Sequence, residues 1–122
     1  DHQTGELLYS RQPDTQRHPA SITKVMTLYV AFEEMAAGRL REDDMIRVSA
    51  HAAGQAPSKL YLRPGMQISV RDAIGTIATK SANDAAAALA EHISGSEAAF
   101  AERMTATARR LGMNATRFMN AS

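Results

Sequence analysis

Apolar residues recur at helical spacing in four stretches of this chain, and the longest stretch follows Pro19. Over residues 20–37 the apolar side chains fall on most of the circumference of a helix. Such a pattern predicts a helix that is buried on nearly all sides. Gly38 is a suitable residue to end it, because glycine readily adopts the left-handed conformation that follows many helices.

Three further helices are predicted from residues that cap helix N-termini. Each capping residue precedes a stretch of helical periodicity, and Ser69 is followed three positions later by Asp72, as in a weaker form of the capping box. Gly112 is placed to end the last helix. The predicted caps and helices are Ser69 with a helix to about residue 79, Asn83 with 84–93, and Ser96 with a helix to about residue 111.

Four short stretches have strand character, and none has an obvious partner with which to form one sheet. They are residues 6–10, 45–49, 67–70 and 116–119. Pro64-Gly65 predicts a type II turn before the third, and residues 51–58 are predicted to be irregular. The pattern as a whole predicts an α+β chain that is rich in helix.

The two ends of the chain lead us to expect a part of a larger domain. A turn precedes residues 6–10, as in the second half of a hairpin whose first strand would lie before residue 1. The chain also stops directly after the strand-like residues 116–119. A sheet needs several strands to be stable, so the missing partners are expected elsewhere in the domain.

Composition excludes several classes of function. The 122 residues carry a net charge of +1 with no basic face, which argues against nucleic acid as a partner. Cysteine is absent, so thiol catalysis and disulfides are excluded. No stretch has the length of a membrane span, and no signal peptide is present in these residues. No metal site is predicted, since no two of the four histidines have zinc-ligand spacing: His2, His18, His51 and His92.

Ser21 and Lys24 provide the clearest candidate chemistry. At this spacing at the start of a helix, a hydroxyl and an amine lie on one face, one turn apart. A serine becomes a nucleophile when a base takes its proton, and a lysine can do so if its amine is neutral. Burial in the apolar helix and the positive end of the helix dipole both favour the neutral amine. The alternative is a capping serine and a lysine that reaches the surface.

Ser81 and Asn83 add a second hydroxyl and an amide that could complete such a site. Their alternative roles are structural, with Ser81 in a loop and Asn83 capping a helix. Other hydrolase and phosphate-binding motifs are absent, since the sequence contains neither G-x-S-x-G nor a glycine-rich phosphate loop.

Four segments of the chain together match a known pattern more specifically than either short motif does. In this order along the chain they closely resemble the serine D-alanyl-D-alanine carboxypeptidases, the low-molecular-mass penicillin-binding proteins of bacterial cell walls. The segments are Thr4-Gly5-Glu6-Leu7-Leu8-Tyr9, Pro19-Ala20-Ser21-Ile22-Thr23-Lys24-Val25-Met26-Thr27, Leu62-Arg63-Pro64-Gly65-Met66 and Ser81-Ala82-Asn83-Asp84-Ala85.

The resemblance implies an activity and a role for each motif residue. Ser21 would attack the carbonyl of the penultimate D-alanine of a peptidoglycan stem peptide, with Lys24 as general base. Ser81 would relay a proton to the leaving amine, and Asn83 would hydrogen-bond the substrate and help to hold Lys24. β-Lactams would acylate Ser21. No cofactor or metal is implied, and the expected location is periplasmic or extracytoplasmic, with membrane contact only through a segment outside this chain.

The sequence departs from the family pattern at two points. Ala82 occupies a position where the family usually has Gly or Asp, and a side chain directed away from the site would be tolerated there. No K-T-G or K-S-G occurs in these residues. Residues 1–122 are therefore expected to form the N-terminal, helix-rich part of one catalytic domain of the penicillin-binding protein and β-lactamase fold, with an incomplete antiparallel sheet and no activity alone.

Two other functions stay open at this point. A class A β-lactamase has similar motif spacing and would need a deacylating glutamate. A non-catalytic module that binds cell wall or penicillin could retain the motifs without turnover.

Overall fold

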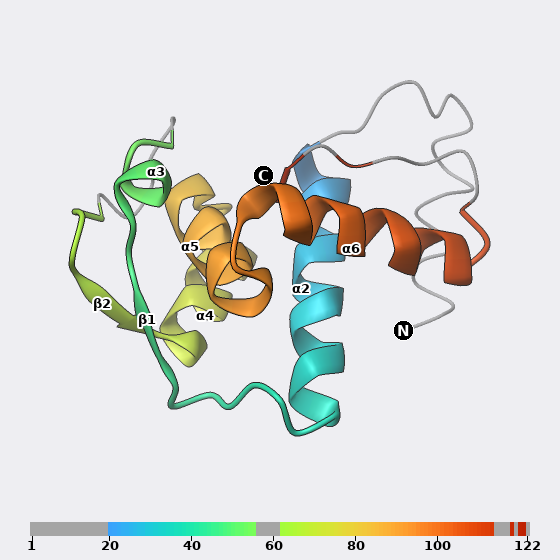
Figure 1. Ribbon diagram of the computed structural model, residues 1–122, viewed down its shortest axis with the longest axis horizontal. Helices are drawn as coiled ribbons and strands as arrows, with labels where there is room; N and C mark the ends of the chain where they lie inside the picture. Colours follow the sequence, from blue (N-terminus) through green and yellow to red (C-terminus); the bar gives the residue numbers. More distant parts are fainter. Residues whose placement is uncertain (1–19, 56–61, 114–117, 119, 122) are drawn as a thin grey trace.

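The computed structural model describes residues 20–55, 62–113, 118, 120 and 121 (Figure 1). The predicted strand at 6–10 lies outside these residues, as does the predicted strand at 116–119 apart from Phe118. The elements in chain order are α2 (Ala20–Ala36), β1 (Met45–Arg47), α3 (Ala50–Ala53), β2 (Gln67–Ser69), α4 (Val70–Lys80), α5 (Asn83–Ser94) and α6 (Glu97–Arg110).

Helix α5 is the centre of the fold, since it contacts α2, α3, α4, α6 and β1 (Figure 1). Its residues from Ala85 to Ala90 are fully buried, and all of them except Leu89 are alanine. Side chains this small allow neighbouring helices to approach closely. The alanine run of α5 therefore packs tightly at the centre of the fold.

The small sheet consists of β1 and β2 in antiparallel pairing. Ile46 pairs with Ile68, and both side chains are buried. The expectation that the four strand candidates had no way to pair was therefore wrong for these two. Gly65 has φ +85° and Met66 N donates to Arg63 O at 3.1 Å, which agrees with the predicted type II turn.

Local capping chemistry places most of the helix ends where they were predicted. The Ser69 and Ser96 hydroxyls cap α4 and α6 by accepting from Asp72 N and Ala99 N, each at 3.0 Å. Gly38 and Gly112 adopt positive φ after α2 and α6.

Two local predictions were wrong. Residues 51–58 were expected to be irregular, yet 51–53 belong to α3, while 56–58 lie outside the described residues. Helix α3 forms because the Ser49 hydroxyl accepts from Ala52 N at 3.0 Å and caps a short run of helix-forming residues. Asn83 was expected to cap α5, yet it is the first helical residue and Ala82 holds the capping position without a side-chain bond.

Helix α2 is not buried on nearly all sides, which corrects a third prediction. Phe32 is 51% exposed and Val25 is 39% exposed, while Val30 and Ala31 are fully buried. Helices α4, α5 and α6 pack against α2 and cover the buried side. A helix with apolar residues all round can be buried completely, but its sequence does not specify what covers each face.

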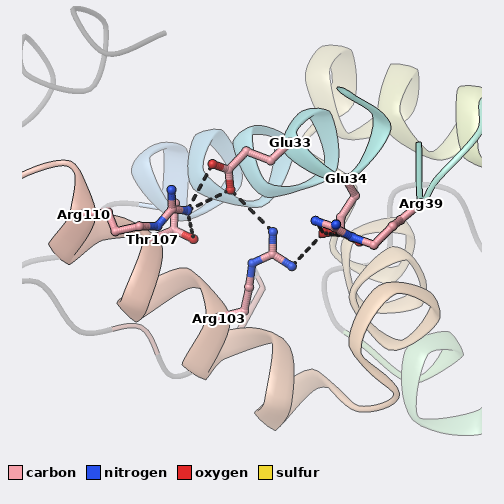
Figure 2. A network of polar contacts seen from close by, with 6 residues as sticks. All are labelled: Glu33, Glu34, Arg39, Arg103, Thr107 and Arg110. Carbon is pink, nitrogen blue, oxygen red and sulfur yellow. Dashed lines mark hydrogen bonds and ion pairs between the residues drawn. The ribbon is translucent and has the colours of Figure 1, made fainter. Parts of the chain in front are cut away.

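Ion pairs join α2 to α6 and to the loop that follows α2 (Figure 2). Glu34 is buried and accepts from Arg39, with the shortest contact at 2.8 Å, and from Arg103 at 2.9 Å. Arg110 donates to both oxygens of Glu33 at 3.0 Å. Hydrogen bonding by Arg39 and Arg103 holds the pKa of Glu34 below its ordinary value of 4.5, against the opposing effect of burial.

We predict that Glu34→Ala lowers the free energy of unfolding by about 1–3 kcal/mol at neutral pH, because it leaves guanidinium groups without their buried partner. The lowered pKa of Glu34 means that its stabilisation is present above about pH 4.5 and is lost as the pH falls through the lower folded value. Urea unfolding of the full-length protein at several pH values measures both effects.

The matched control is Glu42→Ala, which removes the solvent-exposed pair between Arg71 and Glu42. It should change the stability by at most about 0.5 kcal/mol. Equal effects of the two substitutions would contradict the role given to Glu34.

Candidate active site

The first two turns of α2 carry Ser21 and Lys24. The backbone of Ser21 is helical, and its side chain lies outside the described part of the chain. Lys24 is only 6% exposed, and its neighbours Ile22 and Met26 belong to the hydrophobic core. Burial lowers the pKa of Lys24 below its ordinary value of 10.5. The surface lysine considered as an alternative is therefore excluded.

Ser81 lies between α4 and α5 in a left-handed conformation, with φ 53° and ψ 41°. It is the only residue other than glycine with positive φ in the described part of the chain. Its backbone N–H donates to Ile77 O at 3.1 Å and closes the end of α4. Such a backbone is unfavourable for a serine, and here it forms the left-handed cap with which α4 ends.

Asn83 is half-buried in the first turn of α5, and it has interaction partners in the structure. Ala82, between it and Ser81, is fully buried in the hydrophobic core. The methyl group of Ala82 thus packs into the interior, as the tolerance of this departure from the family pattern requires.

The helices that border the two motifs pack against one another. Helix α2, which carries Ser21 and Lys24, packs against both α4 and α5, and Ser81 and Asn83 occupy the junction of those two helices. An amine, a hydroxyl and an amide are the kinds of group that can deprotonate a serine and pass a proton on, and Lys24, Ser81 and Asn83 carry them.

Sequence reasoning missed Asp84 as an anchor of this region. Asp84 is fully buried, and its carboxylate accepts from Leu62 N at 3.0 Å and from Ala85 N at 2.8 Å. It thereby fixes the segment at Leu62 beside the start of α5. An aspartate in the first helical turn after Asn83 was the available signal, because the positive end of the helix dipole favours a carboxylate there.

His51 and Glu97 form a further pair of ionisable residues, and their contact joins α3 to α6. His51 Nε2 lies 2.7 Å from Glu97 Oε1, and this hydrogen bond raises the pKa of His51. Among the described residues, no group of three or more His, Cys, Asp or Glu side chains could hold a metal ion.

The helix-rich α+β architecture is shared with solved D-alanyl-D-alanine carboxypeptidases and penicillin-binding proteins. The crystal structure of the carboxypeptidase DacD from Francisella tularensis superposes with a TM-score of 0.83 at 44% identity, over 87% of this chain and 26% of that chain. Penicillin-binding protein D2 from Listeria monocytogenes, solved with ampicillin bound, gives a TM-score of 0.67 at 30% identity, over 89% of this chain and 44% of that one.

The sequence comparisons identify the family. The family described as D-alanyl-D-alanine carboxypeptidase, peptidase S11, matches residues 1–122. The carboxypeptidase DacF of Bacillus subtilis is 39% identical over 117 residues, which are 96% of this chain and 30% of that protein. This chain belongs to the D-alanyl-D-alanine carboxypeptidase family, and it spans about 30% of the length of the curated relatives that it matches.

We predict that Ser81→Gly raises the free energy of unfolding by about 1 kcal/mol, because glycine adopts positive φ without the steric cost that serine carries. Thermal or urea unfolding of the full-length protein measures the change. Ala78→Gly is the control, since Ala78 is exposed within α4, where glycine should destabilise the helix by about 1 kcal/mol. A loss of stability in Ser81→Gly would show that its backbone conformation carries no strain.

Proposed function

We propose that this chain carries the nucleophile, the general base and the second motif of a serine-type D-alanyl-D-alanine carboxypeptidase. The observation that supports the proposal most strongly is the burial of Lys24 and the resulting decrease of its pKa. Membership of the carboxypeptidase family adds independent support.

In the proposed reaction, the Ser21 hydroxyl attacks the carbonyl carbon of the penultimate D-alanine of a peptidoglycan stem peptide. The neutral Lys24 amine takes the hydroxyl proton as the bond to carbon forms. The C–N bond to the terminal D-alanine then breaks, and Ser81 relays a proton to the leaving amine. Asn83 hydrogen-bonds the substrate and helps to hold Lys24. Water hydrolyses the acyl-enzyme ester and regenerates the Ser21 hydroxyl.

The start of α2 would contribute electrostatically to the same step. The N–H groups of the first helical turn have no partners within the helix and point toward the end that carries Ser21. Hydrogen bonds from such groups, together with the helix dipole, stabilise the negative oxygen that forms on an attacked carbonyl. The same partial charge disfavours an ammonium at Lys24, so both effects favour acylation.

Inhibition by β-lactams follows from the same chemistry, because a β-lactam offers Ser21 a reactive amide with the shape of the D-alanyl-D-alanine end. The ampicillin-bound Listeria relative supports this part of the proposal. A substrate in peptidoglycan places the proposed site of action outside the cytoplasm, facing the cell wall, with a role in peptidoglycan synthesis and cell shape.

Activity is proposed to need more of the catalytic domain than this chain contains. The chain spans about 30% of its curated relatives, and it contains neither K-T-G nor K-S-G. In the family that motif binds the substrate carboxylate and lines the cleft opposite the nucleophile. The rest of the catalytic domain is thus the first partner expected for residues 1–122. No helix of the described residues is long and apolar enough to cross a bilayer.

The proposal is tested by covalent labelling of the full-length protein with a fluorescent penicillin, followed by intact mass and peptide mapping. We predict a long-lived adduct on Ser21, its loss in Ser21→Ala, and a decrease of about 100-fold or more in the acylation rate of Lys24→Met. Ser96→Ala, which removes only a helix cap, is the control and should be labelled like the wild type. Labelling of Ser21→Ala at the wild-type rate would reject Ser21 as the nucleophile.

The same samples distinguish the two alternative functions. A β-lactamase would hydrolyse the adduct within about a second or less, because typical kcat values of enzymes exceed about 1 per second. A non-catalytic module would bind a peptide ending in D-alanyl-D-alanine without releasing D-alanine. Either result in the wild-type protein would overturn the carboxypeptidase proposal.

A further inference from the structure

Thr27 is a fully buried polar residue on α2 that the proposed chemistry does not use. Its hydroxyl lies 2.8 Å from Ala121 O and 3.1 Å from Thr23 O, so the closer acceptor is 94 positions away in the chain. The carbonyl of Ala121 lies outside any regular element, and Ala121 is itself fully buried. A buried carbonyl without a partner would be costly, so this contact has a direct structural purpose.

The backbone N–H of Ala121 is bound by a residue of a second helix, α6. Ala121 N donates to Glu97 Oε2 at 3.0 Å, and Glu97 is buried at the start of α6. Both backbone groups of Ala121 are therefore bound by side chains, one from α2 and one from α6. We call this pair of contacts, Thr27 to Ala121 O and Ala121 N to Glu97, the Ala121 clamp.

The Ala121 clamp lies within one turn of the proposed general base. Thr27 follows Lys24 by three positions on α2, and side chains at this spacing are neighbours on one helix face, about 5–6 Å apart at Cβ. Figure 1 shows the C-terminal end of the chain beside the first turns of α2. The contact at Ala121 therefore lies on the face of α2 that also carries Lys24.

We propose that Thr27 is a positioning residue, which holds Ala121 against α2 and thereby keeps water from the amine of Lys24. This role rests on the proposed function, since it matters to catalysis only if Lys24 is the base. Thr27 does not itself touch the reacting atoms in the proposed reaction.

Charged groups on the neighbouring elements do not account for the lowered pKa of Lys24. Burial lowers its pKa, and among the described residues no ionic partner contributes. The ionisable residues on the helices packed against α2 are Arg71, Asp72 and Lys80 of α4, Asp84, Glu91 and His92 of α5, and Glu97, Glu102, Arg103, Arg109 and Arg110 of α6. Loss of the Ala121 clamp should therefore act on Lys24 through water entry.

The test compares Thr27→Val with Thr27→Ser in the full-length protein. Valine has nearly the shape of threonine but no donor, whereas serine keeps the hydroxyl. The measurement is the second-order rate of acylation by a penicillin as a function of pH. A base works in its neutral form, so a higher Lys24 pKa moves the acidic limb of this profile to higher pH.

We expect Thr27→Val to shift that limb to higher pH and to lower the neutral-pH rate by about tenfold or more. Thr27→Ser should keep the position of the wild-type limb. A purely structural role of Thr27 would scale the whole profile without moving it, and that result would overturn the proposal. An unchanged profile in Thr27→Val would overturn it too.

Glu97 provides a second route if Thr27→Val does not fold. Glu97→Met removes the acceptor for Ala121 N and should shift the limb in the same direction, while Glu97→Gln keeps an acceptor oxygen and should not.

Amide exchange of Ala121 in the wild type is the readout that needs no variant: slow exchange is expected, and exchange at the rate of a free peptide would overturn the Ala121 clamp. If the wild-type protein is never acylated, the carboxypeptidase function is rejected. The exchange measurement still tests the Ala121 clamp in that case, because it does not depend on acylation.

Discussion

The proposed chemistry depends on an amine that is kept out of water. Lys24 is a cation under ordinary conditions, and taking a cation into an apolar interior is unfavourable unless it loses its proton. The fold makes this possible by packing α2 against α4, α5 and α6, and burial then lowers the pKa of Lys24. A lysine in this state can accept a proton from a hydroxyl one turn away, which an exposed lysine at neutral pH cannot do.

Several contacts in the described structure hold that packing in place. The alanines of α5 let the neighbouring helices approach closely, and Asp84 fixes the start of α5 by accepting from two backbone amides. At the far end of α2, Glu34 binds Arg39 and Arg103 and ties α2 to α6 (Figure 2). Ser81 lies in the second motif, and among the described residues it is the one non-glycine position with positive φ.

Sequence alone predicted many of the features that local chemistry determines. Ser69 and Ser96 cap helices by contacts three residues along the chain, and glycines end helices by their own backbone freedom, so these positions were predicted correctly. Most of the features that were missed depend on partners far away in the sequence. Two missed features are local, namely helix α3 after its Ser49 cap and the start of α5 at Asn83. Which side of α2 is covered, whether two short strands pair, and where Thr27 and Asp84 find acceptors or donors are all decided by the packed fold.

The most direct test of the central claim is a titration of the Lys24 amine itself. In the full-length protein with selectively labelled lysine, the side-chain resonance of Lys24 is assigned by comparison with Lys24→Met and followed by NMR as the pH is raised, with the exposed Lys80 as an internal reference. Lys24 is expected to lose its proton at a lower pH than its ordinary pKa of 10.5. A Lys24 amine that titrates at or above that value would contradict its proposed role as a desolvated base.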